Sequence, residues 1–142
     1  AMVDVDQGKR VNDRHGHDTG DEVLRKVARA LSHVPDARAY RYGGEEFTLL
    51  FPGSNTGDVL DRLEAVRERI AANPFRLRST PRKMNGRRGR NRAAAGAPSL
   101  NVTVSIGVAE SDGGNAAPAS VIAKADKALY RAKDRGRNAV CR

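Results

Sequence analysis

The sequence has little of what several common protein classes require. Cys141 is the only cysteine among its 142 residues, which excludes an internal disulfide and a multi-cysteine zinc site and fits a reducing compartment. No stretch approaches the roughly 20 apolar residues of a membrane helix, and the chain does not begin with the basic start and apolar run of a signal peptide. We therefore expect one soluble domain without a targeting segment.

Acidic residues are missing from one long segment, between Glu68 and Glu110. Eight basic residues lie within residues 76–92, and without them the net charge of +9 would fall to +1. The nearly balanced remainder argues against binding of nucleic acid over the whole surface, so DNA is not expected as the primary partner. The basic segment could contact nucleic acid or another acidic surface as an accessory property, but it lacks the interleaved aromatic residues that stack on bases.

The apolar pattern predicts one α+β domain over residues 1–142. The predicted strands are residues 1–6, 37–42, 46–51, 101–110 and 139–141, and the predicted helices are residues 18–32, 58–72 and 119–133. This order contains the strand, helix, hairpin and helix arrangement of ferredoxin-like or palm-type cores, in which α-helices flank a central, mostly antiparallel β-sheet. Residues 76–97 are predicted to be a basic loop insertion, and the first few residues of the wider segment from Asn73 to Pro98 could still form a strand.

Two carboxylates, those of Asp4 and Asp6, end the first predicted strand. At positions i and i+2 they face the same side, while Val3 and Val5 face the core. Such a pair repels unless something neutralises it, and Mg²⁺ is suitable because it takes carboxylate oxygens and leaves positions for substrate phosphates. Taken alone, the pair is better explained as a solvated strand end.

A glycine turn followed by two acidic residues occurs within residues 41–47, Arg-Tyr-Gly-Gly-Glu-Glu-Phe. Gly43 and Gly44 would let the backbone approach a bulky anionic ligand, and Glu45 and Glu46 could hold a metal beside it. A polar hairpin turn would explain these residues too.

This segment resembles the GGDEF signature of diguanylate cyclases in its GGEEF form, and the similarity extends along the chain from Asp4 to Asn138. Three further blocks match the family's patterns at the family's spacing. They are the DxDxxKxxND…GHxxGDxxL run that begins at Asp4, the SIGVA strand at residues 105–109, and the closing ADxALYxAKxxGRN at residues 125–138. Four blocks in the right order are a highly specific signal.

The resemblance implies a diguanylate cyclase that condenses two GTP molecules into cyclic di-GMP and two pyrophosphates, with Mg²⁺ or Mn²⁺, in a homodimer. Its metal ligands would be Asp4, the backbone carbonyl of Val5, and Glu45. Glu46 would assist in metal or proton handling, so the catalytic residues would be Asp4, Glu45 and Glu46.

The resemblance also implies a substrate-binding set. Asn12 and Asp21 would read guanine, because a carboxylate accepts from its N1–H and its amine, a donor pair that adenine lacks on that edge. Gly43 and Gly44 would let the backbone approach GTP. The phosphates would be held by Lys9, Lys133 and Arg137. Each of these cations could instead be a surface residue. Lys133, at the end of the last predicted helix, would also be favoured there by the helix dipole.

The chain departs from the family pattern in three places. Gln7-Gly8 stands where an aromatic residue is common, so we expect a more flexible phosphate loop whose N–H groups can still point at a phosphate. The helix and DxLTxLxNR segment that normally begin the domain are not found, so we expect its amino-terminal part to be missing. The RxxD site for inhibitory product is absent, because Val34 and Ala37 occupy its positions and Asp36 would face the other way on a strand.

The alternative function is a catalytically inactive GGDEF module that senses GTP or cyclic di-GMP. The presence of Asp4, Glu45 and Glu46 counts against it, since degenerate members usually lose the signature acids. We expect a cytoplasmic location, either free or as the cytoplasmic part of a larger membrane-bound protein, with the sensory or regulatory domain outside this chain.

Overall fold

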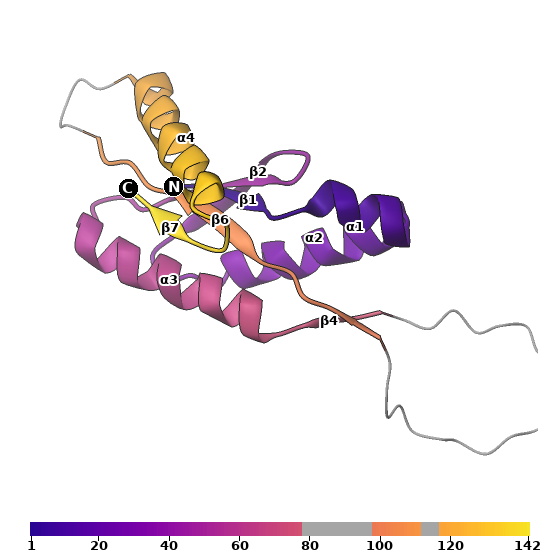
Figure 1. Cartoon of the computed structure of the whole chain (residues 1–142). Helices are drawn as coiled ribbons and strands as arrows, with labels where there is room; N and C mark the ends of the chain where they lie inside the picture. The colour runs from indigo at the N-terminus through magenta and orange to yellow at the C-terminus, as the bar shows by residue number, and fades with distance from the viewer. Residues whose placement is uncertain (78–97, 112–116) are drawn as a thin grey trace, which may run out of the picture.

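A mixed sheet of five strands, flanked by helices, confirms the expected α+β class. The structure is a computed structural model that describes residues 1–77, 98–111 and 117–142 (Figure 1). The helices are α1 (Gly8–His15), α2 (His17–Leu31), α3 (Thr56–Ala72) and α4 (Pro118–Asp134). The strands are β1 (Met2–Val5), β2 (Arg38–Gly43), β3 (Glu46–Leu50), β4 (Phe75–Arg76), β5 (Ser99–Leu100), β6 (Val104–Gly107) and β7 (Val140–Cys141). None of these helices is long and apolar enough to cross a membrane.

Strand β1 is the central strand of the main sheet, whose order is β2-β3-β1-β6-β7. It pairs with β3 and β6 in antiparallel fashion, and β7 joins β6 in parallel. In this register Asp4 lies opposite Glu46 of β3 and Ser105 of β6. Because directly opposite residues share a face, these three polar side chains lie on one side of the sheet.

The two faces of the sheet are covered by different helices, with α2 and α3 on one face and α4 on the other (Figure 1). Val3 and Val5 belong to the core formed with α2 and α3. Met2, which points the opposite way, packs instead with Ala125 and Leu129 of α4. The alternation along β1 therefore places the side chain of Asp4 on the face covered by α4, whereas the larger apolar core lies on the opposite face.

Most predicted elements are confirmed, with changed bounds. Helix α3 begins before residue 58 because the side chain of Asn55 accepts a hydrogen bond from the Asp58 N–H at 2.9 Å and caps the first turn. The strand predicted at residues 101–110 is shorter and comprises only β6. Of the predicted basic insertion, residues 78–97 lie outside the described residues. The expectation that the first residues after Asn73 could form a strand is confirmed, because β4 pairs with β5.

Helix α1 was not predicted from the apolar pattern, which indicated no helix before residue 18. Only Val11 is buried among its residues, so the helix has no apolar repeat to reveal it. It also lacks a side-chain N-cap, and the residue before it, Gln7, adopts the left-handed conformation with φ 59°. The expected phosphate loop is accordingly short, since Gly8 is already the first residue of α1.

Close packing between α4 and β6 depends on Gly107. A Cβ atom at this buried position would lie 2.1 Å from the carbonyl oxygen of Ala125 and 2.2 Å from the backbone nitrogen of Leu129. Both atoms belong to the backbone of α4, which cannot move aside as a side chain could. Gly107 thus sets how closely α4, the helix that carries Lys133, approaches the sheet.

We expect Gly107→Ala to destabilise the domain by about 3 kcal/mol or more, since overpacking that forces backbone shifts lies at the upper end of such costs. Urea denaturation measures this directly. Gly43→Ala is the matched control, because a Cβ at Gly43 meets nothing within 4 Å and its φ is not positive. A Gly107→Ala protein as stable as that control would contradict the packing argument.

Candidate active site

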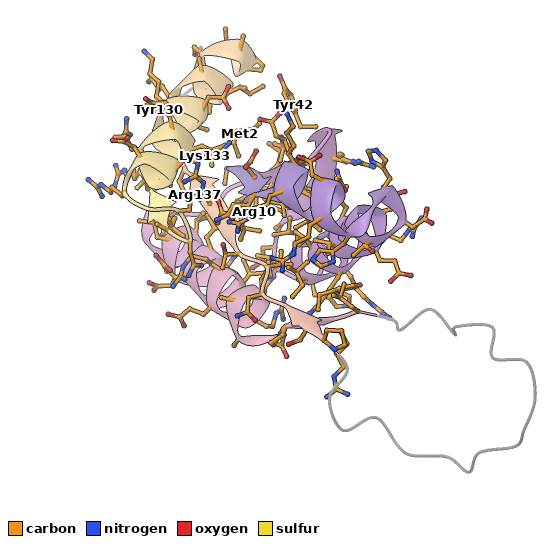
Figure 2. All side chains as sticks on the ribbon, turned by 45° about the vertical axis from the view of Figure 1, so that its right-hand side comes forward. Met2, Arg10, Tyr42, Tyr130, Lys133 and Arg137 are labelled. Carbon is orange, nitrogen blue, oxygen red and sulfur yellow. The ribbon has the colours of Figure 1, made fainter. Side chains whose placement is uncertain are left out.

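The side chain of Asp4 meets a cation from the opposite end of the sequence. Lys133 Nζ lies 3.0 Å from Asp4 Oδ2, and the side chains are 33% and 15% exposed. An ion pair that is partly removed from water is stronger than a surface pair. In Figure 2, Lys133 and Arg137 lie at the carboxyl end of α4 on its inner side, toward Met2 of β1 and Arg10 of α1. The fold therefore brings together Asp4 and Lys133, two of the predicted site residues.

Glu45 joins this pair from the turn between β2 and β3. Its carbonyl oxygen accepts a hydrogen bond from the Val5 N–H at 3.2 Å, which fixes the turn beside the end of β1. Burial and the negative charge of Asp4 raise the pKa of the Glu45 carboxyl, while the Gly8 N–H and Lys133 act in the opposite direction. Glu45 and Asp4 therefore share one partly desolvated site at the start of α1.

The donor set at this site fits a hard divalent cation. Two carboxylates that disfavour each other's ionisation would both be stabilised by such an ion, which prefers oxygen ligands. Among the described residues, no group of three or more His, Cys, Asp or Glu side chains is assembled to hold a metal. A cation would thus rely on Asp4, Glu45 and a backbone oxygen such as that of Val5, as the resemblance implies. Glu46 is half-buried opposite Asp4 and stands beside them.

Position 8 requires glycine, because the side chain of Glu45 fills the space that a Cβ atom would occupy. A Cβ at Gly8 would come within 2.0 Å of Glu45 Oε2. The Gly8 N–H, one of the unpaired donors at the start of α1, instead donates to that carboxylate. The first turn of α1 is a suitable place for an anion, and in this structure the carboxylate of Glu45 takes that role. Lys9, the next residue, is exposed and would be free to meet a phosphate.

The residues predicted to read guanine lie where α1 meets α2. Asn12 packs against Gly20 so closely that a Cβ at Gly20 would be 1.7 Å from Asn12 Oδ1. The next residue, Asp21, is exposed at a small cavity of about 150 Å³ between α2 and the β2–β3 hairpin. The cavity is lined by Asp21, Leu24, Arg25, Ala28, Arg41 and Phe47. This cavity offers an apolar wall, two arginines and the Asp21 carboxylate, which suits the N–H donors of a planar base, but Asn12 is not among its lining residues.

The glycine turn is open to solvent. Gly44 has φ 44°, and an added Cβ at either Gly43 or Gly44 would meet nothing within 4 Å. The turn is held by Arg41, whose Nη2 and Nε donate to the Gly44 carbonyl at 2.8 and 3.2 Å. The glycines thus serve the turn's conformation and leave room above it for a ligand.

Asp6 was predicted to share a metal-facing side with Asp4, but the structure gives it different partners. Its carboxylate is buried and accepts hydrogen bonds from Ser105 Oγ at 2.6 Å, Thr103 Oγ1 at 2.7 Å and the Asn138 N–H at 3.1 Å. The only sequence signal for this arrangement is that serine begins the SIGVA block and asparagine ends the GRN block. Residues so distant in sequence could not be paired by spacing alone.

Residues 34–37, which would carry an RxxD site, contain no arginine or lysine. Val34 is buried and Ala37 is half-buried. Asp36 lies before β2 with φ 55°, and it pairs with Arg62 at 3.0 Å. Asp36, the carboxylate nearest to the RxxD positions, is therefore already paired with Arg62.

Comparison with known families agrees with this geometry. The model of the family described as "Diguanylate cyclase, GGDEF domain" matches residues 1–92 and 87–139. The chain belongs to the GGDEF domain family. The response regulator PleD of Caulobacter vibrioides is 38% identical over 143 residues, which cover 98% of this chain and 28% of PleD. Diguanylate cyclase DgcP of Pseudomonas aeruginosa is 36% identical over 140 residues, covering 97% of this chain and 18% of DgcP.

Solved GGDEF structures have the same fold. The GGDEF domain of DgcB from Caulobacter crescentus, in complex with c-di-GMP, superposes with a TM-score of 0.83 and 37% identity, covering 99% of this chain and 74% of that one. The active GGEEF domain of a diguanylate cyclase from Vibrio cholerae gives a TM-score of 0.75 and 30% identity, with coverage of 99% and 78%. This GGDEF chain thus spans less than a third of the length of relatives such as PleD and DgcP.

We expect Glu45→Gln to stabilise the metal-free domain at neutral pH. The raised pKa of Glu45 means that its ionised form is disfavoured in the folded state, and the penalty is present above the folded-state pKa. Glutamine carries no charge and can still accept from the Gly8 N–H. The melting temperature with a chelator should be higher than wild type at pH 7, and the difference should vanish as the pH falls below the ordinary pKa of glutamate. Asp61→Asn, a change at an exposed carboxylate of α3, should have no such effect, and a Glu45→Gln variant less stable at pH 7 would contradict the prediction.

Proposed function

We propose that this GGDEF domain is a diguanylate cyclase that converts two GTP molecules into cyclic di-GMP and two pyrophosphates, with Mg²⁺ or Mn²⁺. The observation that carries the proposal is the meeting of Asp4, Glu45 and Lys133 at the start of α1. Carboxylates for a metal, a cation for phosphate and a helix N-terminus are the components that phosphoryl transfer requires. They come from β1, the β2–β3 turn, α4 and α1.

In this proposal the side chains position the substrate and do little covalent chemistry. Asp4, Glu45 and the carbonyl of Val5 would hold the metal, which when bound neutralises the triphosphate and polarises the α-phosphorus. Lys133 would leave Asp4 for a phosphate oxygen, and Glu45 would leave the Gly8 N–H, so that this donor can also face a phosphate. Lys9 and Arg137, both exposed, would complete the phosphate contacts. Glu46 would assist in metal or proton handling.

The chemistry of the product requires two copies of the site. In each half-reaction a ribose 3′-oxygen forms a bond to the α-phosphorus of the other GTP, and the bond to pyrophosphate breaks as the hydroxyl loses its proton. The candidate base cavity beside Asp21 has room for one GTP base, so in this proposal a second domain presents the other GTP in line. We therefore propose a homodimer as the active form.

The second candidate is a module that binds GTP or cyclic di-GMP without turnover. It is favoured by the DgcB structure, which is a complex with c-di-GMP. The candidate metal ligands Asp4 and Glu45 support catalysis instead. Regulation from outside the chain also fits the family, because diguanylate cyclase SiaD was solved in complex with its activator SiaC.

The decisive experiment incubates the purified chain with GTP and Mg²⁺ or Mn²⁺ and follows cyclic di-GMP and pyrophosphate by chromatography. We expect product from the wild type, and at least about a 100-fold loss in Asp4→Asn and Glu45→Gln, because several kcal/mol of charge stabilisation depends on each ligand. Asp61→Asn is the control for loss of an exposed carboxylate and should be unchanged. Binding of cyclic di-GMP without any synthesis would favour the sensor, and full activity of either site variant would contradict the metal assignment.

Base selectivity is a separate prediction. Asp21→Ala should weaken GTP binding by about 10-fold or more, because a hydrogen bond to a charged group contributes about 1.5–3 kcal/mol, and Asn12→Ala should weaken it by about fivefold, because a neutral hydrogen bond contributes about 1 kcal/mol. ATP binding should change little, since adenine does not use those contacts. Isothermal titration with each nucleotide measures both. If GTP and ATP lose affinity equally, the base does not bind beside Asp21.

A further inference from the structure

Asp6 is a buried charge with no cationic partner among the described residues. It is 6% exposed, and its three hydrogen-bond donors come from β6, from the residues before β6 and from the turn between α4 and β7. A buried carboxylate needs such donors in place of water. Asp6 thus joins the central strand to a turn that is 132 residues away in sequence.

That turn is conformationally costly. Gly136, Arg137 and Asn138 all have positive φ, of 105°, 67° and 46°. Glycine adopts such angles readily, but arginine and asparagine do so at a cost that surrounding contacts must offset. The Asn138 N–H donates to Asp6 Oδ2, and Asn138 Oδ1 accepts from Arg67 Nη1 of α3 at 3.0 Å. The turn is therefore held from two sides.

The turn carries Arg137, whose guanidinium makes no hydrogen bond or ion pair with the described residues, and Lys133 lies four residues earlier, in the last turn of α4. In Figure 2 both residues are labelled beside the carboxyl end of α4. On β1, Asp4 meets Lys133 directly, and Asp6, two residues later, fixes the backbone next to Arg137. Each carboxylate of the DxD pattern therefore acts on one of these two cations, Asp4 by a direct ion pair with Lys133 and Asp6 through the backbone beside Arg137.

We propose that Asp6 is a positioning residue rather than a metal ligand, and that by holding the Arg137–Asn138 turn it sets where the Arg137 guanidinium meets the polyphosphate of the substrate. This inference rests on the proposed function, since it requires a nucleoside triphosphate at this site. The role depends on hydrogen-bond acceptance, so the negative charge is not required. In Asp6→Asn the amide group can donate to Ser105 Oγ, which can accept, while the remaining oxygen still accepts from the Asn138 N–H.

The first test compares two asparagine substitutions at neighbouring carboxylates. Asp6→Asn should keep cyclic di-GMP synthesis within about threefold of wild type and leave the Mg²⁺ dependence unchanged, whereas Asp4→Asn should lose both. A loss of Mg²⁺ affinity in Asp6→Asn equal to that of Asp4→Asn would overturn the positioning role, because it would make Asp6 a metal ligand.

The second test is a double-mutant cycle between Asp6→Ala and Arg137→Ala, read out as GTP affinity by titration calorimetry. Each single change should weaken GTP by about 10-fold, and the double change should be no weaker than Arg137→Ala alone, because Asp6 acts through Arg137. Additive losses would overturn the proposal, as a merely structural Asp6 would weaken binding independently of Arg137. Asp61→Ala is the control.

Hydrogen exchange of the Asn138 amide provides a measurement that does not depend on GTP. It should be faster in Asp6→Ala than in wild type and unchanged in Asp6→Asn. Should Asp6→Ala fail to fold, Asn138→Ala loosens the same turn by removing the Arg67 contact at a residue with positive φ, and it must show the same non-additivity with Arg137→Ala. If the wild type binds no GTP, the proposed function fails together with the phosphate role. If it makes cyclic di-GMP but the cycle is additive, only the positioning role fails.

Discussion

Compensation of negative charge at the carboxyl end of β1 is the constraint on which the site and much of the fold depend. Asp4, Asp6 and Glu45 meet there, and each is stabilised differently. Asp4 pairs with Lys133, Asp6 accepts three hydrogen bonds, and Glu45 accepts from the Gly8 N–H while its pKa stays raised. A partly buried carboxylate without such partners would be strongly unfavourable. The partners come from β6, α1 and α4, so this one requirement ties together segments from both ends of the chain.

Helix α4 combines this electrostatic role with a packing role. Its apolar residues Ala125 and Leu129 cover Met2, and Gly107 lets its backbone approach β6 closely. Lys133 extends from the same helix to Asp4, so a shift of the packing would also move the cation. Since Met2 and Asp4 alternate with Val3 and Val5 on β1, the strand can complete the larger core on one face and carry chemistry on the other.

The sequence allowed prediction of those parts that depend on local patterns. Apolar spacing was enough to predict α3 and α4, and the glycine turn was enough to predict the β2–β3 hairpin. The family resemblance was enough to expect Asp4, Glu45 and Lys133 in one site. Helix α1 could not be predicted, because a single buried residue, Val11, leaves no periodic signal. The partners of Asp6 could not be predicted either, because they depend on how β6 and the turn after α4 are brought beside β1, which only the folded chain determines.

The same contacts that stabilise the ligand-free site also control how it could be filled. Lys133 cannot turn to a phosphate without leaving Asp4 uncompensated in a position that is only 15% exposed. A metal ion at Asp4 would take over that compensation and release the lysine, and at Glu45 it would release the Gly8 N–H in the same way. Phosphate binding in turn adds negative charge that favours the metal. Either ligand alone would have to displace a group that is already engaged in a contact within the protein. Metal and nucleotide should therefore strengthen each other's binding.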